Sequence, residues 1–508
     1  MIMYFHVGHG FLKHYNDETY YTSPVFFWTN IEMSLGVVSA CLPTLRPIWP
    51  RYGRTRCRIF GMDNEHETID LVDDPEVNTH IEALNVGFSD RPKENVIAVE
   101  QQIQQQQVPK VSDPQRKYPL REPIKAAWTE LGVKYNPGGG CSGSSEGISE
   151  FLENWCNGQR QPAHLAYSLD NVRVITGAIA HRVEFSQDDI GGKVASAVLL
   201  ADGRRFAARK EIILSAGTLR TPQLLMLSGI GPVDGLSKYG IPVVFETPDV
   251  GKNLMDHFAH YQLFRLRNPQ RGLALGSPLL TDPAFTKGFP TDWAVNEAVP
   301  WDLLEPALKK HESTSGSTLD DRSLLSPGRS HIETFVVYAP AGVPGVPMDG
   351  SYIMTSVMLL LPTSRGSISI TSASPTDFPA VNSNYYDTDA DRVSLIHGTR
   401  RVLQALLDTS AAKDYIESEV PPPGMPPLSA QSPYEDIDAR IRATGLAHHH
   451  PAGSAAMGRM VGTDLYVYGV RGLRIADASV LPVAIGGHPQ ATLYAVAEQG
   501  AELILQDR

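Results

Sequence analysis

The fold depends on two stretches near the C-terminus, TGLAHHHPAGSAAMG at residues 444–458 and LYVYGVRGLRIADASVLPVAIGGHPQATLYAVAEQGAELI at residues 465–504. Each contains a histidine followed by proline, His450 in the first and His488 in the second. Pro489 suits a first helical turn, and apolar side chains recur at helical spacing up to residue 503. We therefore expect His450 on a glycine-bounded loop and His488 at a helix N-terminus. Such an end carries unpaired N–H groups and a partial positive charge that stabilise an anion.

Three blocks of this chain resemble the glucose–methanol–choline (GMC) flavin oxidoreductases, in the family's order and over roughly residues 115–508. The resemblance implies an α/β (α+β) fold, in which an FAD-binding lobe joins a substrate lobe with an antiparallel sheet and helices. It also implies an enzyme that uses FAD to oxidise an alcohol. The first block is EIILSAGTLRTPQLLMLSGIGP at 211–232. The second combines SRGS at 364–367 with NYY at 384–386. The third combines HPAGS at 450–454, VYGVRGLRIADAS at 467–479 and GHPQA at 487–491.

The resemblance assigns chemical roles to the two histidines. Oxidation of a CH–OH group removes a hydride from carbon and a proton from oxygen, and histidine suits the proton because its pKa lies near working pH. His450 is the expected base, and His488 is expected to hold the substrate oxygen and share the proton. The chain is therefore expected to be a GMC-type FAD-dependent alcohol oxidase or dehydrogenase. Its expected cofactor contacts are Ala180, Gly217, Asp477, Ala478, Pro489, Gln490 and Thr492.

Some of these contacts are expected to be made by the backbone. Ala180 matches a backbone contact to adenine. A carboxylate would repel phosphate, so Asp477 is expected to bind backbone or ribose instead. The motifs specify neither the alcohol nor the electron acceptor, so a small-molecule alcohol is the only partner that they imply.

The same residues allow other interpretations. Both histidines could be structural core residues. A metal site at His448, His449 and His450 is disfavoured because three consecutive residues cannot all point at one ion from a helix or strand, so no metal is predicted. A G-x-S-x-G match places Ser145 in a glycine loop, whereas a hydrolase nucleophile lies between a buried strand and a helix. His257 is expected to be a surface or structural residue.

The glycine turn that holds the FAD pyrophosphate is not found where the family has it. The single G-x-G-x-x-G match, Gly138, Gly140 and Gly143, lacks the preceding strand, the following helix and the acidic residue that the fingerprint requires. The sequence therefore predicts an incomplete FAD lobe that binds FAD poorly, with an open groove beside His488. The alternative function is a catalytically silent, truncated GMC protein fused to a membrane-protein fragment.

The N-terminus differs from the rest of the chain. Residues 25–45 contain one charge, Glu32, and are about as long as a membrane crossing requires. Five arginines follow between residues 46 and 58, which would place the later chain on the cytosolic side. The stretch resembles the last transmembrane helix of fungal rhodopsin-like membrane proteins. We expect membrane association through residues 25–45, with a soluble protein as the alternative.

Composition restricts the remaining classes. The net charge of −12 argues against nucleic acid as a partner, and four cysteines in 508 residues do not make a disulfide framework. The expected division is a membrane-like helical segment (1–61), a disordered linker (62–112), part of the FAD lobe (113–262), the substrate lobe (263–443) and the C-terminal part of the FAD lobe with the histidines (444–508). The expected helices are 121–132, 221–227 and 391–407, and the expected strands are 172–185, 195–200, 205–214, 352–361, 366–371 and 380–384.

Overall fold

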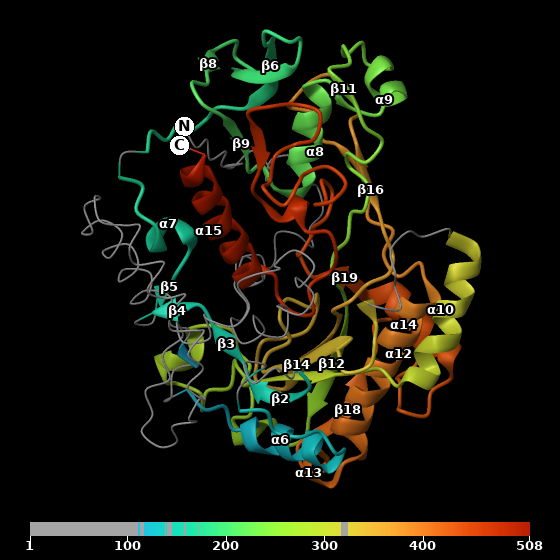
Figure 1. Cartoon of the computed structure of the whole chain (residues 1–508). Coiled ribbons are helices and arrows are strands. Elements are labelled where there is room, and N and C mark those ends of the chain that lie inside the picture. Colours follow the sequence, from blue (N-terminus) through green and yellow to red (C-terminus); the bar gives the residue numbers. More distant parts are fainter. Residues whose placement is uncertain are drawn as a thin grey trace, which may run out of the picture.

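The computed structural model describes residues 110–111 and 116–507, apart from 138, 140–144, 157–158, 171 and 316–323. These residues form two lobes (Figure 1). The sheet lobe is built on a seven-stranded antiparallel sheet, and the small lobe on several short sheets and helix α8 (Gly217–Leu227). Helix α15 (Gln490–Gln506) runs between them (Figure 1). This mixed α/β architecture with antiparallel sheets and helices confirms the expected fold class.

The sheet of the sheet lobe has the strand order β18-β12-β15-β14-β13-β2, and β19 also pairs with β12. Every pairing is antiparallel, and Ala259 lies opposite Met358 in the central pair β12–β15. The strands are β2 (Gly147–Glu150), β12 (Phe258–Leu266), β13 (Trp293–Glu297), β14 (Ile332–Val337), β15 (Tyr352–Leu359), β18 (Ile416–Val420) and β19 (Gly445–Ala447).

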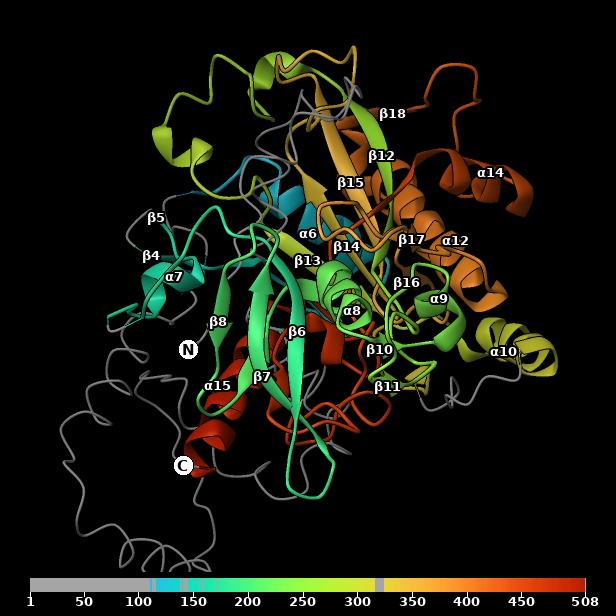
Figure 2. The same ribbon diagram turned by 90° about the horizontal axis from the view of Figure 1, so that it is seen from above.

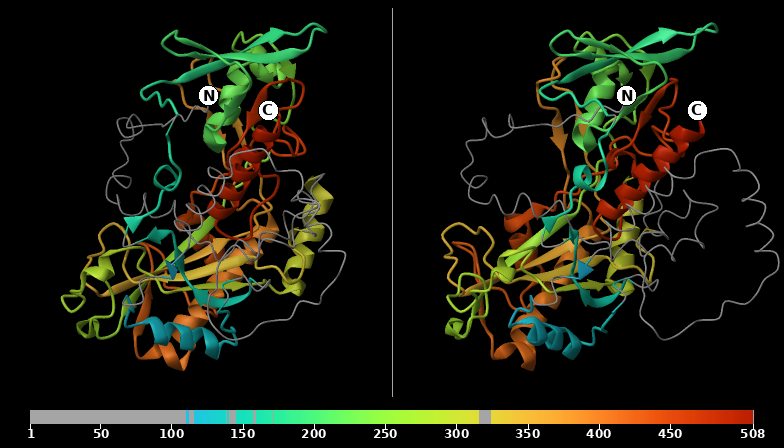
Figure 3. Two further views of the ribbon diagram at one scale, coloured as in Figure 1. Left: turned by 60° about the vertical axis from the view of Figure 1, so that its left-hand side comes forward. Right: turned by 90° about the vertical axis from the view of Figure 1, so that its left-hand side faces the viewer.

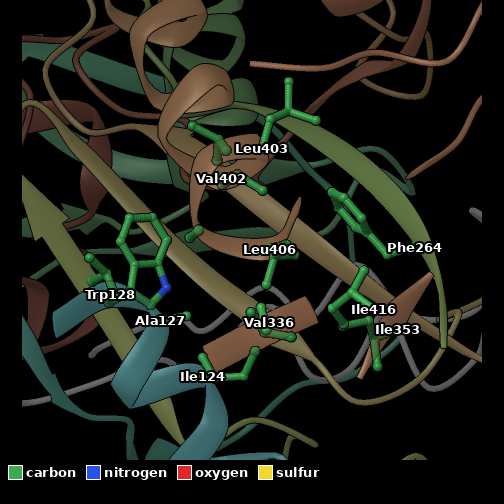
Figure 4. Close-up of a cluster of buried hydrophobic side chains, with 14 of the residues drawn as sticks. Ile124, Ala127, Trp128, Phe264, Val336, Ile353, Val402, Leu403, Leu406 and Ile416 are labelled. Atoms are coloured by element: carbon green, nitrogen blue, oxygen red, sulfur yellow. The ribbon is translucent and has the colours of Figure 1, made fainter. Parts of the chain in front are cut away.

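One face of this sheet is covered by helices. They are α6 (Arg121–Glu130), α12 (Asp389–Leu403), α13 (Ser410–Lys413) and α14 (Tyr434–Thr444), with a π-helical turn at Gln404–Asp408. Their apolar side chains meet those of the strands in one core (Figure 4). Trp128 of α6 is 1 % exposed, and Phe264, Ile353 and Leu403 are fully buried. Burying each such side chain contributes roughly 1.5–3 kcal/mol.

The other face of the sheet is turned toward the small lobe and carries polar groups. Because side chains alternate along a strand, Glu333 and Phe335 of β14 share this face, while Val336 lies in the helix-covered core. Tyr261 of β12 packs with the aromatic and apolar cluster on the same side.

The small lobe joins segments that are far apart in the sequence. Strand β9 (Ile212–Leu214) pairs in parallel with β20 (Leu473–Ile475), with Ile213 opposite Arg474. A single apolar cluster draws on both segments and on α8. The buried Arg474 guanidinium pairs with Glu211 at 2.7 Å and with Asp507. The two segments thus share a parallel strand pair and one apolar cluster.

A three-stranded antiparallel sheet forms the far end of the small lobe (Figures 2 and 3). Its strands are β6 (Ala180–Gln187), β7 (Lys193–Leu200) and β8 (Arg205–Ala207). The remaining elements are β1 (Lys110–Val111), β3 (Leu152–Glu153), β4 (Trp155–Cys156), β5 (Gln159–Arg160), α7 (Ala163–Ala166), β10 (Ile230–Gly231), α9 (Val233–Ser237), β11 (Phe245–Glu246), α10 (Trp301–Ser315), β16 (Ser367–Ser369) and β17 (Ala380–Asn382), with short 3-10 turns at Pro269–Arg271, Pro283–Thr286 and Ala478–Val480.

Several expected elements differ from those observed. The expected strand 205–214 is two strands in different sheets, β8 and β9, separated by the polar residues Arg209 and Lys210. The expected helix 391–407 begins earlier, at Asp389, because the Thr388 hydroxyl accepts a hydrogen bond from the Asp391 N–H and caps it. Within 113–262, α6 and β2 belong to the sheet lobe rather than to the FAD-binding part of the chain.

The expected membrane segment at 25–45 and the expected linker at 62–112 fall in the part of the chain that is not described, apart from β1 at its end. Among the helices that are described, none combines the length and apolar character needed to cross a membrane.

Candidate active site

Four histidines meet where the sheet lobe contacts the small lobe: His257, His448, His450 and His488. Antiparallel pairing of β19 with β12 sets Ala447 opposite Phe258, and the His448 N–H donates to the His257 carbonyl at 2.8 Å. His488 arrives from the other direction, two residues before α15. Its ring centroid lies 4.9 Å from that of His450, with the rings nearly perpendicular. The two histidines expected to be catalytic are thus in contact.

A chain of hydrogen bonds fixes which nitrogen of His450 carries the proton. His257 Nε2 lies 3.0 Å from the Ile485 carbonyl oxygen, which only accepts, so Nε2 of His257 must be the N–H. In a neutral ring, His257 Nδ1 is then an acceptor. His450 Nδ1, 3.0 Å away, must donate to it. The lone pair of the His450 ring is left on Nε2.

Asp256 holds the loop of His450 in place. One carboxylate oxygen accepts the His450 backbone N–H at 2.8 Å, and the other accepts the Tyr385 hydroxyl at 2.6 Å. Burial raises the pKa of Asp256 to about 6, although these hydrogen bonds lower it. The loop position therefore depends on a buried carboxyl group whose two oxygens are both engaged.

Glu333 of β14 is the partner of His488. The His488 Nε2–H donates to the Glu333 carboxylate at 2.7 Å, and both side chains are almost fully buried. His488 Nδ1 has no hydrogen-bond partner among the described residues. The expected open groove beside His488 is therefore wrong, because Glu333 and the neighbouring histidines enclose the ring.

His448 lies behind this pair and is fully buried. Its ring lies nearly parallel to Tyr261, 6.4 Å away, and edge-on to Phe335. Neither of its ring nitrogens finds a hydrogen-bond partner within the described part of the chain. Leaving buried polar atoms unpaired is costly, so this ring requires an explanation beyond packing.

Burial keeps His257, His448 and His450 neutral. It lowers the pKa of His257 to about 3, and the positive charge that His488 can carry adds to the effect. The pKa values of His448 and His450 are lowered well below 6.5 for the same reasons, with burial as the largest cause. At neutral pH the lone pair on His450 Nε2 is thus available to accept a proton.

A cavity of about 10 Å³ lies beside His450, His257 and Asp256. Its other walls are almost entirely apolar: Met255, Pro362, Ala452, Leu481, Val483, Ala484, Ile485 and Pro489. A space of this size holds about one water molecule, whereas ligand pockets are commonly about 300–1,000 Å³.

The expected cofactor contacts fall into three places. Gly217, Asp477 and Ala478 lie just beyond the carboxyl ends of β9 and β20, where ligands bind in parallel sheets. Pro489, Gln490 and Thr492 form the N-terminal turn of α15, whose cap residue makes no side-chain hydrogen bond. Ala180 begins β6 in the three-stranded sheet.

The Asp477 carboxylate is directed at backbone and hydroxyl groups. It accepts hydrogen bonds from the Gly217 N–H at 3.0 Å, the Thr221 hydroxyl at 2.6 Å and the Ser479 N–H at 2.8 Å. The Thr218 hydroxyl then donates to the Pro451 carbonyl at 2.7 Å, which ties this turn to the His450 loop. Gly217 has a φ of +78°, and a Cβ added there would meet nothing within 4 Å.

Sequence reasoning missed three residues of this site. Glu333 and His448 were assigned no role in catalysis or binding, and His257 was expected to be structural, whereas it contacts His450 directly. A carboxylate in the largely apolar strand IETFVV is the available signal for Glu333. Of the other matches, Ser145 pairs with Ser330 at 2.8 Å just before β2, while Gly138, Gly140 and Gly143 lie outside the described residues.

The fold thus places a pair of histidines between a large antiparallel sheet and a lobe with a parallel strand pair. The GMC oxidoreductase family matches residues 68–259 and 362–497, and a fungal rhodopsin domain matches residues 2–51. The chain is 41% identical over 394 residues to GMC-type oxidoreductase acuG of Aspergillus aculeatus, covering 77% of this chain and 74% of that protein. It belongs to the GMC oxidoreductase family.

Other relatives match over less of their length. Dehydrogenase str4 of Strobilurus tenacellus is 32% identical over 401 residues, which cover 70% of this chain and 63% of that protein. Formate oxidase of Aspergillus oryzae has a similar structure, with a TM-score of 0.66 and 26% identity over 77% of this chain and 70% of its own. A fungal aryl-alcohol oxidase, at 24% identity and a TM-score of 0.62, shares the fold over 77% of this chain and 72% of its own.

FAD is the cofactor that the family and these neighbours indicate. The described residues fit part of it. The open turn at Gly217 is tied to the His450 loop by the Thr218–Pro451 hydrogen bond, and the N-terminus of α15, without a side-chain cap, follows His488. Outside the partly described glycine stretch before β2, no G-x-G-x-x-G turn joins a strand to a helix among the described residues. The family match begins at residue 68, before the main described region.

Proposed function

We propose that this chain oxidises the CH–OH group of a small alcohol, with His450 as the base and His488 as its partner. The observation that carries the proposal is the hydrogen-bond chain from the Ile485 carbonyl through His257 to His450. It leaves the lone pair on His450 Nε2, in a ring that burial keeps neutral. A neutral, oriented imidazole beside a small pocket is what a general base requires.

FAD, when bound, accepts the hydride from the alcohol carbon. The residues of the chain handle the proton. His450 Nε2 takes it from the hydroxyl, and a His488 ring protonated on Nδ1 would donate that N–H to the substrate oxygen. When His488 carries a proton on Nδ1, the Glu333 carboxylate 2.7 Å from Nε2 balances its charge. Gly217, Asp477, Ala478, Pro489, Gln490 and Thr492 are proposed to line the cofactor, and Ala180 to reach adenine.

The pocket favours a small substrate with an apolar substituent. Its walls are aliphatic apart from Asp256, His257 and His450, and both Asp256 oxygens are already engaged. An alcohol that widened this cavity would place its hydroxyl at His450 and its carbon chain against Leu481, Val483 and Ile485. A charged substituent would find no partner along the aliphatic walls.

The test compares the full chain with two variants, His450→Ala and His449→Asn. Bound FAD is quantified from absorbance near about 450 nm, and turnover is measured over a series of small alcohols. We expect His450→Ala to lower the rate about 10²–10⁴-fold while FAD is retained. His449→Asn is the matched control because His449 is exposed and has a φ of +60°, which asparagine tolerates. Equal turnover in wild type and His450→Ala would refute the base assignment.

A second candidate is a catalytically silent chain that holds FAD poorly. It is favoured by the observation that the described residues contain no complete turn for the pyrophosphate. It predicts a colourless purified chain, with flavin binding restored when a G-x-G-x-x-G strand–turn–helix unit is placed ahead of residue 113. A yellow chain loaded with one FAD per molecule would rule it out.

The proposal also includes membrane association through residues 25–45, with the chain after residue 46 on the cytosolic side. The fungal rhodopsin match at residues 2–51 supports it. Flotation with lipid vesicles tests this: the full chain is expected to float, and a variant with three Val/Leu→Lys substitutions inside 25–45 to stay at the bottom of the gradient. Equal behaviour of both would contradict the proposal.

A further inference from the structure

The histidine cluster presents three nitrogen ligands to one point, and the proposed oxidation uses only two of its histidines. His448, His450 and His488 each offer a ring nitrogen, and these nitrogens lie within 4.8 Å of one another. We infer that they form a binding site for a single divalent transition-metal cation of the zinc type. This inference does not depend on the proposed alcohol oxidation.

Hydrogen bonding has already set two of the rings for coordination. A metal takes the lone pair of a neutral imidazole, while the opposite nitrogen donates to a carboxylate or carbonyl that orients the ring. His488 donates from Nε2 to Glu333, which leaves its lone pair on the unpartnered Nδ1. His450 donates from Nδ1 through His257 to the Ile485 carbonyl, which leaves its lone pair on Nε2.

His448 supplies the third ligand and is the independent observation. It is fully buried, and within the described part of the chain neither ring nitrogen has a hydrogen-bond partner. Its ring centroid lies 5.1 Å from His450 and 5.7 Å from His488. A bound cation would satisfy the nitrogen that protein groups leave unpaired.

The backbone explains how two residues of a three-histidine run reach one ion. His449 has a φ of +60° and is exposed, so the chain turns there and sends His448 and His450 to the same side. The geometric objection to three consecutive ligands is therefore met, because the third ligand is His488. Three histidine nitrogens at about 2.1 Å from a tetrahedral ion lie about 3.4 Å apart, so small side-chain rotations complete the site.

The donor set selects the metal class. Three neutral imidazoles suit Zn²⁺, Cu²⁺ and Ni²⁺, whereas Mg²⁺ and Ca²⁺ prefer oxygen ligands. With three protein ligands, the fourth position is left for water or another small ligand, as in open zinc sites. Since His450 Nε2 cannot bind a metal and accept a substrate proton at once, an occupied site would block the proposed oxidation.

The experiment titrates the chelator-treated full chain with Zn²⁺, following binding by calorimetry and Co²⁺ by its visible spectrum. We expect one equivalent to bind and Co²⁺ to show the intense bands of a four-coordinate site. His448→Phe keeps the aromatic packing against Tyr261 and Phe335 and removes the ligand, so its affinity should fall more than about tenfold. Glu333→Gln should weaken binding about 10–100-fold by loosening the orientation of His488. His449→Asn is the matched control and should bind as wild type.

The outcomes separate a built site from surface binding. Zn²⁺ affinity that is the same in wild type, His448→Phe and His449→Asn would overturn the inference, as would absence of binding to wild type. If His448→Phe does not fold, the wild type loaded with Cu²⁺ decides by pulsed electron paramagnetic resonance. Imidazole nitrogen couplings are expected, and coordination by oxygen alone would overturn the inference.

Discussion

Different contacts hold the helix-covered core of the sheet lobe and the strand pair of the small lobe. In the sheet lobe, the helix-covered face is a continuous apolar core, with Trp128, Phe264 and Leu403 at 1 % exposure or less. In the small lobe, the ion pairs of the buried Arg474 fix the pairing of β9 with β20. The Asp477 carboxylate fixes the neighbouring turn at Gly217. Apolar contacts are not directional, whereas these polar contacts hold only one geometry.

This difference explains where the site lies. Catalytic and ligand-binding groups must be held in place, and here they sit on the polar face of the sheet against the small lobe. Glu333 and Phe335 point there from the same strand that contributes Val336 to the core behind. The core therefore fixes the position of the strand, and the hydrogen bonds between the lobes fix the histidines.

The largest expected effect on stability is in the sheet lobe. Trp128→Ala removes the largest fully buried side chain of the core between α6 and the sheet and should lower the free energy of unfolding by about 3–5 kcal/mol. Chemical denaturation measures the loss, and Trp128→Phe, which keeps an aromatic ring, should lose less. Hydrogen exchange of this variant then tests whether the lobes unfold separately. Faster exchange confined to the sheet lobe would indicate two unfolding units, whereas equal acceleration in α8 and α15 would show that the lobes unfold together.

Protonation of Asp292, which lies beside Arg121 in the sheet lobe, should make the free energy of unfolding depend on pH. Burial raises the pKa of its fully buried carboxyl from 3.8 to about 6, although the Arg121 guanidinium, at 3.2 Å, lowers it. From about pH 4 to 6 the folded protein keeps a proton that the unfolded chain has lost, so stability falls as pH rises through this range. The two pKa values bound the loss at about 3 kcal/mol.

The measurement is the slope of unfolding free energy against pH from 4 to 6 in wild type and Asp292→Asn. The variant should lose part of the slope. Glu122→Gln is the matched control because Glu122 is exposed and also pairs with Arg121, at 3.6 Å. A slope that is the same in all three proteins would contradict the expectation.

Contiguous motifs made much of this structure predictable. His450, His488, the helix after Pro489 and the strand at β15 each depend on a short stretch whose residue types and spacing indicate the local structure. Glu333 could not be placed in the same way, because its partner His488 lies 155 residues away and only strand order brings them together. Apolar spacing predicts a single strand over 205–214, because spacing alone does not show that β8 and β9 belong to different sheets.

A smaller effect is expected from Asp477 in the small lobe. Asp477→Ala leaves the Gly217 N–H, the Thr221 hydroxyl and the Ser479 N–H without their acceptor and should cost about 1–3 kcal/mol. FAD retention should also fall, because the Gly217 turn loses its anchor. Thr221→Val removes one of the three donors and should cost less. Wild-type stability and flavin content in Asp477→Ala would show that the turn does not depend on this carboxylate.

The smallest expected effect concerns the start of α12, in the sheet lobe. The Thr388 hydroxyl accepts a hydrogen bond from the Asp391 N–H at 3.2 Å, and it lies 2.6 Å from the Thr363 hydroxyl. Thr388→Ala should cost about 1 kcal/mol, the usual loss for a helix N-cap, because the first N–H groups of the helix lose their acceptor. Thr388→Ser keeps the hydroxyl and should stay within a few tenths of the wild-type value. If both variants lose the same stability, the methyl group of Thr388 rather than its hydroxyl stabilises this helix, and the sheet lobe depends on apolar contacts even at its helix ends.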